Sequence, residues 1–125
     1  MLIIDDAEDN RTIYAFFLAQ DGFDVETAAD GETGVDLAQE GFDVIVMDLT
    51  MPKLDGWEAT RRLKADPRTR AVPVIILTGY PAEAGAHEAE AAGSDRYLTK
   101  PCLPETLAAE IRELLARVPG TQPLA

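Results

Sequence analysis

Polar side chains that suit phosphoryl chemistry follow four strand-like runs in this sequence, each at the point where a run ends. They are Asp5 and Asp6 after residues 2–4, Asp48 after 44–47, Thr78 after 72–77 and Lys100 after 97–99. Three carboxylates in one place repel one another unless a counter-charge lies among them. Mg²⁺ can supply that charge and leaves room for phosphate oxygens, while a lysine ammonium can bind a phosphoryl group. Brought together, these residues predict phosphoryl transfer to an aspartate, with Asp48 as the acceptor.

Five strand-like segments alternate with five helix-like segments along the chain, with no internal repeat. We predict strands at residues 2–4, 23–26, 44–47, 72–77 and 97–99, and helices at residues 9–20, 31–40, 55–64, 81–92 and 104–117. The runs at 44–47 and 72–77 are continuously apolar, as in strands that are buried on both faces. Such alternation favours a parallel sheet with helices on both faces.

The predicted fold class is α/β, a flavodoxin-like (βα)5 doubly wound parallel sheet with strand order 2-1-3-4-5. In that order the first and third strands are neighbours, so Asp5, Asp6 and Asp48 come together at the carboxyl edge of the sheet. Thr78 and Lys100 line the same edge, which is where α/β proteins bind ligands. The fold therefore gathers the residues that the chemistry requires.

Local signals mark the ends and faces of the predicted helices. Asp30 and Asp55 are suitable N-caps, whereas Leu103 is a poor N-cap for the last helix. Apolar residues recur at helical spacing in two helices: Ile13, Phe16 and Phe17 share one face of the first, and Leu107, Ile111 and Leu114 lie at core spacing in the last. These signals support the helices at both ends of the chain.

Length and composition predict one domain over residues 1–118 and a Pro/Gly-containing tail or linker start over 119–125. The net charge of −12 disfavours direct nucleic-acid binding, which needs a basic surface. No apolar run approaches the roughly 20 residues of a membrane span, and no signal peptide is evident. We therefore expect a cytoplasmic chain that makes no contact with a membrane. Cys102 is the only cysteine, so no intrachain disulfide is possible.

Five short motifs carry a resemblance to a known family. They are Ile3-Ile4-Asp5-Asp6, Val46-Met47-Asp48-Leu49-Thr50-Met51-Pro52, Asp55-Gly56, Ile76-Leu77-Thr78-Gly79 and Tyr97-Leu98-Thr99-Lys100-Pro101. From about residue 2 to residue 118, the chain closely resembles the receiver domain of two-component response regulators. As a set these motifs are highly specific for that family.

The resemblance implies a phosphoacceptor that is not a separate enzyme but catalyses its own phosphorylation and dephosphorylation. Asp48 would accept the phosphoryl group from a phosphohistidine on a sensor histidine kinase or a histidine phosphotransfer protein. Asp5, Asp6, Asp48 and the backbone carbonyl of Thr50 would hold Mg²⁺, and Lys100 would contact the phosphoryl group. The chain would thus act in a phosphorelay and pass the signal to a downstream output protein or domain.

The resemblance also implies a switch. Thr78 would move toward the bound phosphoryl group, and Tyr97 would rotate inward, which changes the surface around the fourth helix, fifth strand and fifth helix. Thr50 and Tyr80 would tune the lifetime of the aspartyl phosphate. Two departures from one class of the family, Ala109 and Arg96, weaken the case for that class's symmetric dimer, so a monomer or a weak dimer is expected.

Three residues near these motifs are predicted to be structural. We interpret Cys102 as a small buried hydrophobic residue, His87 as solvent-facing and Trp57 as half-exposed packing. Trp57 could also report on the site by its fluorescence. None of the three is needed for the predicted chemistry.

Other functions remain open at this point. The same fold could serve as a phosphorylation-independent interaction module, although such a module is expected to lose an acid, the threonine or the lysine, and none is lost here. A hydrolase with an aspartyl intermediate would want a carboxylate where Thr50 stands. A flavin binder would want a glycine- and hydroxyl-rich phosphate loop, whereas residues 5–9 are acidic and would repel that phosphate.

Overall fold

A five-stranded parallel sheet forms the centre of the computed structural model, which describes residues 1–51 and 53–117. Its strands are β1 (Leu2–Ile4), β2 (Glu26–Ala28), β3 (Ile45–Met47), β4 (Val74–Thr78) and β5 (Arg96–Thr99). Their order is β2-β1-β3-β4-β5, so the predicted fold class and strand order are confirmed. Pro52 and the predicted tail at 119–125 lie outside the described residues.

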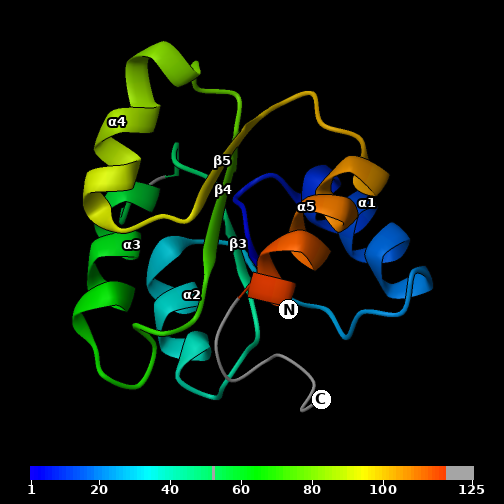
Figure 1. Cartoon of the computed structure of the whole chain (residues 1–125), viewed down its shortest axis with the longest axis horizontal. Coiled ribbons are helices and arrows are strands. Elements are labelled where there is room, and N and C mark those ends of the chain that lie inside the picture. Colours follow the sequence, from blue (N-terminus) through cyan, green and yellow to red (C-terminus); the bar gives the residue numbers. More distant parts are fainter. Residues whose placement is uncertain (52, 118–125) are drawn as a thin grey trace.

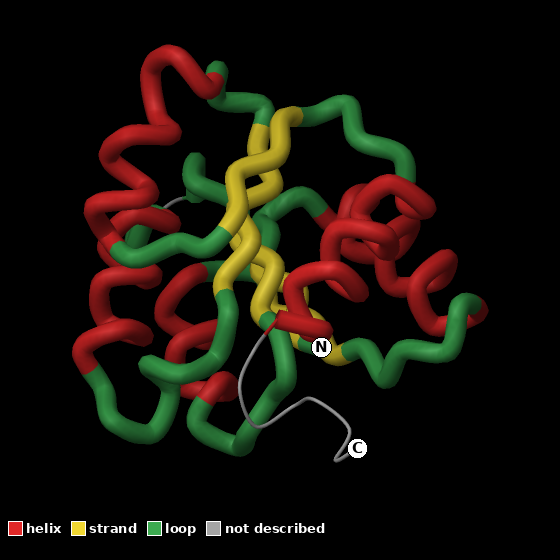
Figure 2. Tube along the Cα trace, in the orientation of Figure 1, coloured by secondary structure: helices red, strands yellow, loops and turns green. Residues whose placement is uncertain are grey.

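Five helices cover the two faces of this sheet. They are α1 (Glu8–Gln20), α2 (Gly31–Ala38), α3 (Gly56–Ala65), α4 (Ala82–Ala92) and α5 (Pro104–Arg117). Helices α1 and α5 lie on one side of the sheet, and α2, α3 and α4 lie on the other (Figure 1). Figure 2 shows the strands running between these two helical layers. Within the described residues, no helix is long and apolar enough to span a membrane.

Alternation along β3 explains why its sequence is apolar without a break. Ile45 and Met47 face the core under α2, α3 and α4, whereas Val44 and Val46 face the core under α1 and α5. Successive side chains of a strand point to opposite faces, and here both faces are covered. The continuous apolar run therefore contributes side chains to two separate hydrophobic cores, one on each face of the sheet.

The second strand is where the prediction was wrong. It was placed at residues 23–26, but β2 comprises Glu26–Ala28 and pairs with β1, with Glu26 opposite Leu2. Phe23 and Val25 are apolar because they pack against the core under α1 and α5. Of the three residues of β2, only Ala28 is buried, because β2 is an edge strand. All other predicted boundaries lie within two residues of those found.

Helix α1 buries a different face from the one that its apolar residues mark. Ile13, Phe16 and Phe17 share a face, yet they are 49%, 55% and 51% exposed. Tyr14 and Leu18, four residues apart, are the buried residues of α1. In α5, by contrast, Leu107, Ile111 and Leu114 are buried as their spacing predicts.

Both predicted N-caps are confirmed. The carboxylate of Asp30 accepts a hydrogen bond from the amide of Thr33 at 2.8 Å, and that of Asp55 accepts one from the amide of Glu58 at 2.9 Å. Each carboxylate satisfies an amide that has no partner within its helix. At the end of α4, Gly93 adopts the left-handed conformation that closes a helix, with φ of 109°.

Candidate functional site

Three carboxyl groups meet at the carboxyl edge of the sheet. Asp5 follows β1 and Asp48 follows β3, and these strands are paired, with Ile4 opposite Met47. One carboxylate oxygen from each of Asp5, Asp6 and Asp48 lies within 4.8 Å of the others. Asp5 and Asp48 are only 4% and 6% exposed, whereas Asp6 faces solvent. The acidic cluster therefore has two buried members at the sheet edge and one member that is open to solvent.

Lys100 joins two of these carboxylates. Its Nζ lies 2.8 Å from Oδ2 of Asp5 and 3.3 Å from Oδ2 of Asp48, although β5 is two strands away from β3. Burial lowers the pKa of the Lys100 ammonium, but its hydrogen bond to Asp5 and the charges of Asp48 and Asp5 outweigh burial and raise it. The site therefore contains a stable cation, yet three carboxyl groups outnumber it.

Backbone hydrogen bonds hold the two buried acids in place. The amide of Asp48 donates to the carbonyl of Ile4 at 3.0 Å, and Oδ1 of Asp48 accepts from the amide of Thr50 at 3.4 Å. Oδ1 of Asp5 accepts from the amide of Ala7 at 2.9 Å. Each acid therefore has one oxygen turned toward a backbone amide and the other toward Lys100.

Gly56 explains the Asp55-Gly56 motif. The amide of Gly56 donates to the carbonyl of Leu49 at 2.9 Å, which brings the start of α3 against the segment that follows β3. A Cβ at Gly56 would overlap the carbonyl oxygen of Asp48 and lie 2.7 Å from Cα of Leu49. Glycine is therefore required for α3 to begin so close to Asp48.

Thr78, Tyr80 and Tyr97 form a second group beside the acids. Thr78 is fully buried at the end of β4, and its Oγ1 accepts from the amide of Tyr80 at 3.2 Å. The hydroxyl of Tyr97 donates to the carbonyl of Tyr80 at 2.9 Å. Burial raises the pKa of Tyr97, and the nearby Tyr80 and Asp48 raise it further. Within the described residues, no hydrogen bond joins Thr78 Oγ1 to Asp48 or Lys100.

An aromatic contact links this group to α3. The rings of Trp57 and Tyr80 meet edge to face, with centroids 5.2 Å apart and planes at 88°. Trp57 is half-buried against the core, as predicted. The indole therefore lies next to the residue whose backbone contacts both Thr78 and Tyr97.

Three residues near the site were missed by the sequence reasoning. On α1, Tyr14 and Arg11 bond to backbone carbonyls of the loops that carry Lys100 and Asp5. On α4, Gly85 lies under the rings of Tyr80 and Tyr97. Only Gly85 left a signal in the sequence, because a glycine inside a helix is unfavourable unless something requires it.

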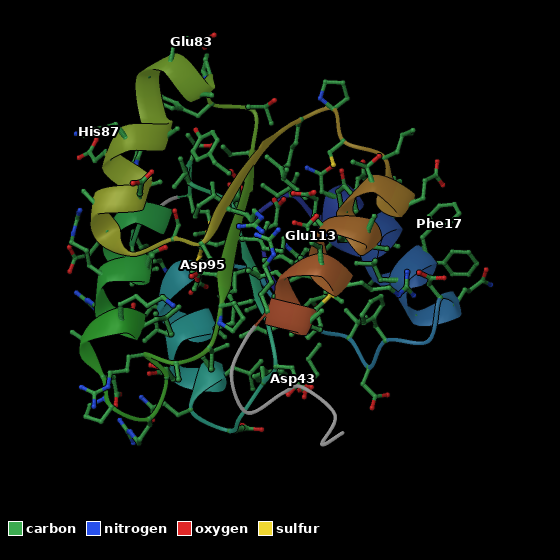
Figure 3. The ribbon with its side chains drawn as sticks, viewed as in Figure 1. Phe17, Asp43, Glu83, His87, Asp95 and Glu113 are labelled. Carbon is green, nitrogen blue, oxygen red and sulfur yellow. The ribbon has the colours of Figure 1, made fainter. Side chains whose placement is uncertain are left out.

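Three other residues named from the sequence, His87, Cys102 and Arg96, form no hydrogen bond or ion pair with Asp5, Asp6 or Asp48 in the described part of the chain. His87 is exposed on the outer side of α4 (Figure 3). Cys102 is partly buried against the core under α1 and α5, and burial raises the pKa of its thiol. Arg96 forms ion pairs with Glu110 and Glu113 of α5, at 3.8 and 3.4 Å. Its charge is thus engaged within the chain.

Comparison with known proteins identifies close relatives. Residues 1–112 match the family described as the response regulator receiver domain. The protein PilH of Pseudomonas aeruginosa is 41% identical over 117 residues, which cover 93% of this chain and 97% of PilH. The chain spans only about half the length of several other curated relatives that it matches, which are transcriptional regulators.

Solved structures agree with the sequence matches. The chemotaxis protein CheY4 of Vibrio cholerae superposes with a TM-score of 0.84 at 33% identity, over 90% of this chain and 94% of that one. The receiver domain of the sensor histidine kinase PA1611 from Pseudomonas aeruginosa superposes with a TM-score of 0.82 at 35% identity, over 90% and 93%. That receiver domain was solved with a magnesium ion coordinated in its active site cleft.

Proposed function

The chain belongs to the response regulator receiver family of two-component systems, and on that premise we propose that it accepts a phosphoryl group on Asp48. The observation that carries the proposal is the pair of contacts from Lys100 to Asp5 and Asp48, made at the same sheet edge as Asp6. Family membership alone does not supply a working acceptor. Here the acid cluster, the lysine and the threonine are all present at the carboxyl edge of one sheet.

In the proposed reaction a carboxylate oxygen of Asp48 attacks the phosphorus of a phosphohistidine. The new bond joins that oxygen to phosphorus as the bond from phosphorus to the imidazole nitrogen breaks. The imidazole nitrogen keeps the electron pair, and the imidazole leaves in its neutral form with one proton taken from solvent. Lys100 offsets negative charge on the transferring group, because its ammonium already lies against the acceptor carboxylate. The chain's own contribution is therefore an acceptor and a fixed positive charge beside it.

The acidic cluster fits a divalent cation. Receiver domains bind Mg²⁺ in their acidic site, and the donors here are oxygens, which Mg²⁺ prefers. We propose that Asp5, Asp6 and Asp48 hold the ion together with the backbone carbonyl of Thr50. Three carboxyl groups facing one ammonium support this, because the excess of acidic groups calls for a further cation. Bound Mg²⁺ would neutralise charge on the phosphoryl oxygens.

The proposed switch starts from the hydrogen bonds of Thr78 and Tyr97. The Thr78 hydroxyl, which now accepts from the Tyr80 amide, would donate to the phosphoryl group on Asp48. Loss of that local bond would free the Tyr80 loop, whose carbonyl is the partner of Tyr97. The surface formed by α4, β5 and α5 would change in consequence and bind a downstream partner. Thr50 and Tyr80 would tune how fast the phosphoryl group is hydrolysed.

An exposed apolar surface gives the phosphodonor a place to bind. We define the α1 patch as Ile13, Phe16, Phe17 and Leu103, the large hydrophobic residues that are exposed within the described part of the chain. Phe17 points away from the body of the protein in Figure 3. Leu103 follows Lys100 by three residues, and α1 begins two residues after Asp6, so both elements of the patch adjoin in sequence the loops that any donor to Asp48 must approach. The proposed occupant is therefore the histidine-bearing face of a kinase or phosphotransfer protein.

The proposed domain boundaries rest on the family match, which covers residues 1–112. Residues 1–118 are proposed to form the whole receiver domain, and residues 119–125 a tail or the start of a linker. Monomer and weak dimer both fit the proposal, because Arg96 is paired with Glu110 and Glu113 within the chain.

Labelling with a small phosphodonor tests the proposal. Acetyl phosphate with Mg²⁺ is expected to give a phosphorylated chain, and the same mixture with excess EDTA is expected to give none. Lys100→Met should slow labelling by at least tenfold, because the charge beside the acceptor is lost. His87→Gln, on the outer side of α4, is the matched control and should label like the wild type. Equal labelling with and without Mg²⁺ would contradict the proposal.

A further inference from the structure

Helix α1 contacts both loops that carry the Asp5–Lys100 ion pair. Nη1 of Arg11 donates to the carbonyl of Asp5 at 2.8 Å, and the hydroxyl of Tyr14 donates to the carbonyl of Cys102 at 2.5 Å. Residues three apart lie on the same face of a helix, so one face of α1 serves both bonds. Both bonds go to backbone carbonyls and are separate from the ion pairs that Lys100 makes with Asp5 and Asp48.

The bond from Tyr14 joins segments that are 88 residues apart in the chain. Tyr14 is 7% exposed and packs in the core under α1 and α5. Burial raises the pKa of its hydroxyl, so the group is a neutral donor at ordinary pH. A hydroxyl in such a place needs a partner, and the Cys102 carbonyl is that partner.

Lys100 lies between two backbone anchors. At the start of the loop formed by residues 100–102, the amide of Lys100 donates to the carbonyl of Thr78 at 2.8 Å. At its end, the carbonyl of Cys102, two residues on, is held by Tyr14. The Lys100 side chain must reach from the end of β5 past β4 to the acids that follow β3 and β1. The path of residues 100–102 decides where its ammonium lies.

We propose that Tyr14 is a positioning residue for Lys100, acting through its hydrogen bond to the Cys102 carbonyl and so fixing the loop that aims the ammonium at Asp5 and Asp48. The inference rests on the proposed function, since it concerns how the same site holds a phosphoryl group. Tyr14 touches neither the acids nor the phosphoryl group in this scheme. Tyr14 acts on the position of Lys100, which does contact the acids and the phosphoryl group.

The test separates binding of the cation from binding of the phosphoryl group. Mg²⁺ affinity depends on the carboxylates, whereas affinity for beryllofluoride, a mimic of the phosphoryl group, also depends on Lys100. Both can be followed through the fluorescence of Trp57, the only tryptophan of the chain. Tyr14→Phe keeps the buried ring and removes only the hydroxyl. We expect beryllofluoride affinity to fall about three- to tenfold, the effect of one hydrogen bond, while Mg²⁺ affinity stays within about twofold.

Thr69→Val is the matched control. The Thr69 hydroxyl is also buried and donates to a backbone carbonyl, that of Leu63, at 2.7 Å. Thr69 lies in the connection between α3 and β4, which enters β4 at the end opposite Thr78. Its loss should cost comparable stability and leave both affinities unchanged. Urea unfolding of both variants shows whether the stability losses match.

Each outcome decides the matter. A selective fall in beryllofluoride affinity for Tyr14→Phe supports the inference. Unchanged affinity, or an equal change in Thr69→Val, overturns it and leaves the proposed function standing. A wild-type chain that neither binds beryllofluoride nor accepts phosphate from acetyl phosphate overturns the proposed function itself. Tyr14→Leu, a second variant that lacks the hydroxyl, should show the same selective loss.

Discussion

The hydroxyl of Tyr97 donates a 2.9 Å hydrogen bond to the carbonyl oxygen of Tyr80. Both side chains lie against Gly85 of α4: a Cβ there would lie 2.6 Å from Oη of Tyr97 and 2.7 Å from Cδ2 of Tyr80. The missing side chain of Gly85 is therefore the space that these two tyrosines occupy. Tyr97 is held in this position from both sides, by the Tyr80 carbonyl and by α4, which has no side chain at Gly85.

Gly85→Ala should push Tyr97 out of this position. Alanine in place of glycine favours a helix by about 1 kcal/mol, but the new methyl group cannot share its site with the Tyr97 hydroxyl. We expect the Tyr97–Tyr80 bond to break and the fluorescence of Trp57, which packs on Tyr80, to change. Nuclear magnetic resonance of the Tyr97 ring measures its orientation directly. His87→Ala, two residues on but solvent-facing, is the control, and an unmoved Tyr97 ring in Gly85→Ala would show that α4 yields instead.

Phe16→Ser should separate the two kinds of phosphodonor. Phe16 is 55% exposed in the α1 patch, so its loss should change the free energy of unfolding by less than about 0.5 kcal/mol. Transfer from a phosphorylated histidine kinase or phosphotransfer protein that labels the wild type should slow about tenfold. Labelling by acetyl phosphate should keep its rate, since this donor needs no protein surface. Glu83→Ser, on α4, is the control. Equal slowing with both donors would contradict the proposal that the α1 patch binds the protein phosphodonor.

Two buried threonines should respond in opposite directions to valine. Thr60 is fully buried in α3, and its hydroxyl has no hydrogen-bond partner among the described residues. Thr60→Val removes an unpaired polar group and should raise the free energy of unfolding by about 1 kcal/mol. Thr69→Val leaves the Leu63 carbonyl unpaired and should lower it by about 1 to 2 kcal/mol. Urea unfolding measures both, and a loss of stability in Thr60→Val would mean that its hydroxyl does have a partner.

Stability at alkaline pH should depend on Tyr14. Burial raises the pKa of the Tyr14 hydroxyl above its ordinary value of 10.0. A group with a raised pKa contributes stability that is complete below its unfolded pKa and is lost as pH rises through its folded pKa. Above about pH 10, the free energy of unfolding should therefore fall more steeply for the wild type than for Tyr14→Phe. Urea unfolding between pH 8 and about pH 12 compares the slopes, and identical slopes would mean that Tyr14 ionises as freely folded as unfolded.

The rim of the site could be predicted because it follows from local patterns. Asp5, Asp48 and Thr78 each come directly after an apolar run, and Lys100 comes directly after the predicted strand at 97–99. Parallel strands bring such positions to one edge. The strand order then decides which of them become neighbours. No contact between distant side chains had to be known in advance.

The supporting contacts could not be predicted, because they depend on partners far away in the chain. The apolar residues of α1 suggest that Phe16 and Phe17 are buried, yet Tyr14 and Leu18 are, since α5 and the sheet lie on that side. The bond from Tyr14 to Cys102 spans 88 residues and leaves no periodic signal. The second strand was misplaced for a similar reason. Phe23 and Val25 look like strand residues but pack beside the sheet instead of pairing within it.

The central claim, that Asp48 is the phosphoacceptor, is tested most directly by intact mass after incubation with Mg²⁺ and acetyl phosphate. The comparison needs the wild type, Asp48→Asn and the control Asp43→Asn, an exposed aspartate that comes before β3 (Figure 3). We predict an added mass of about 80 Da, one phosphoryl group, on the wild type and on Asp43→Asn, and none on Asp48→Asn. An adduct of the same size and rate on Asp48→Asn would contradict the claim.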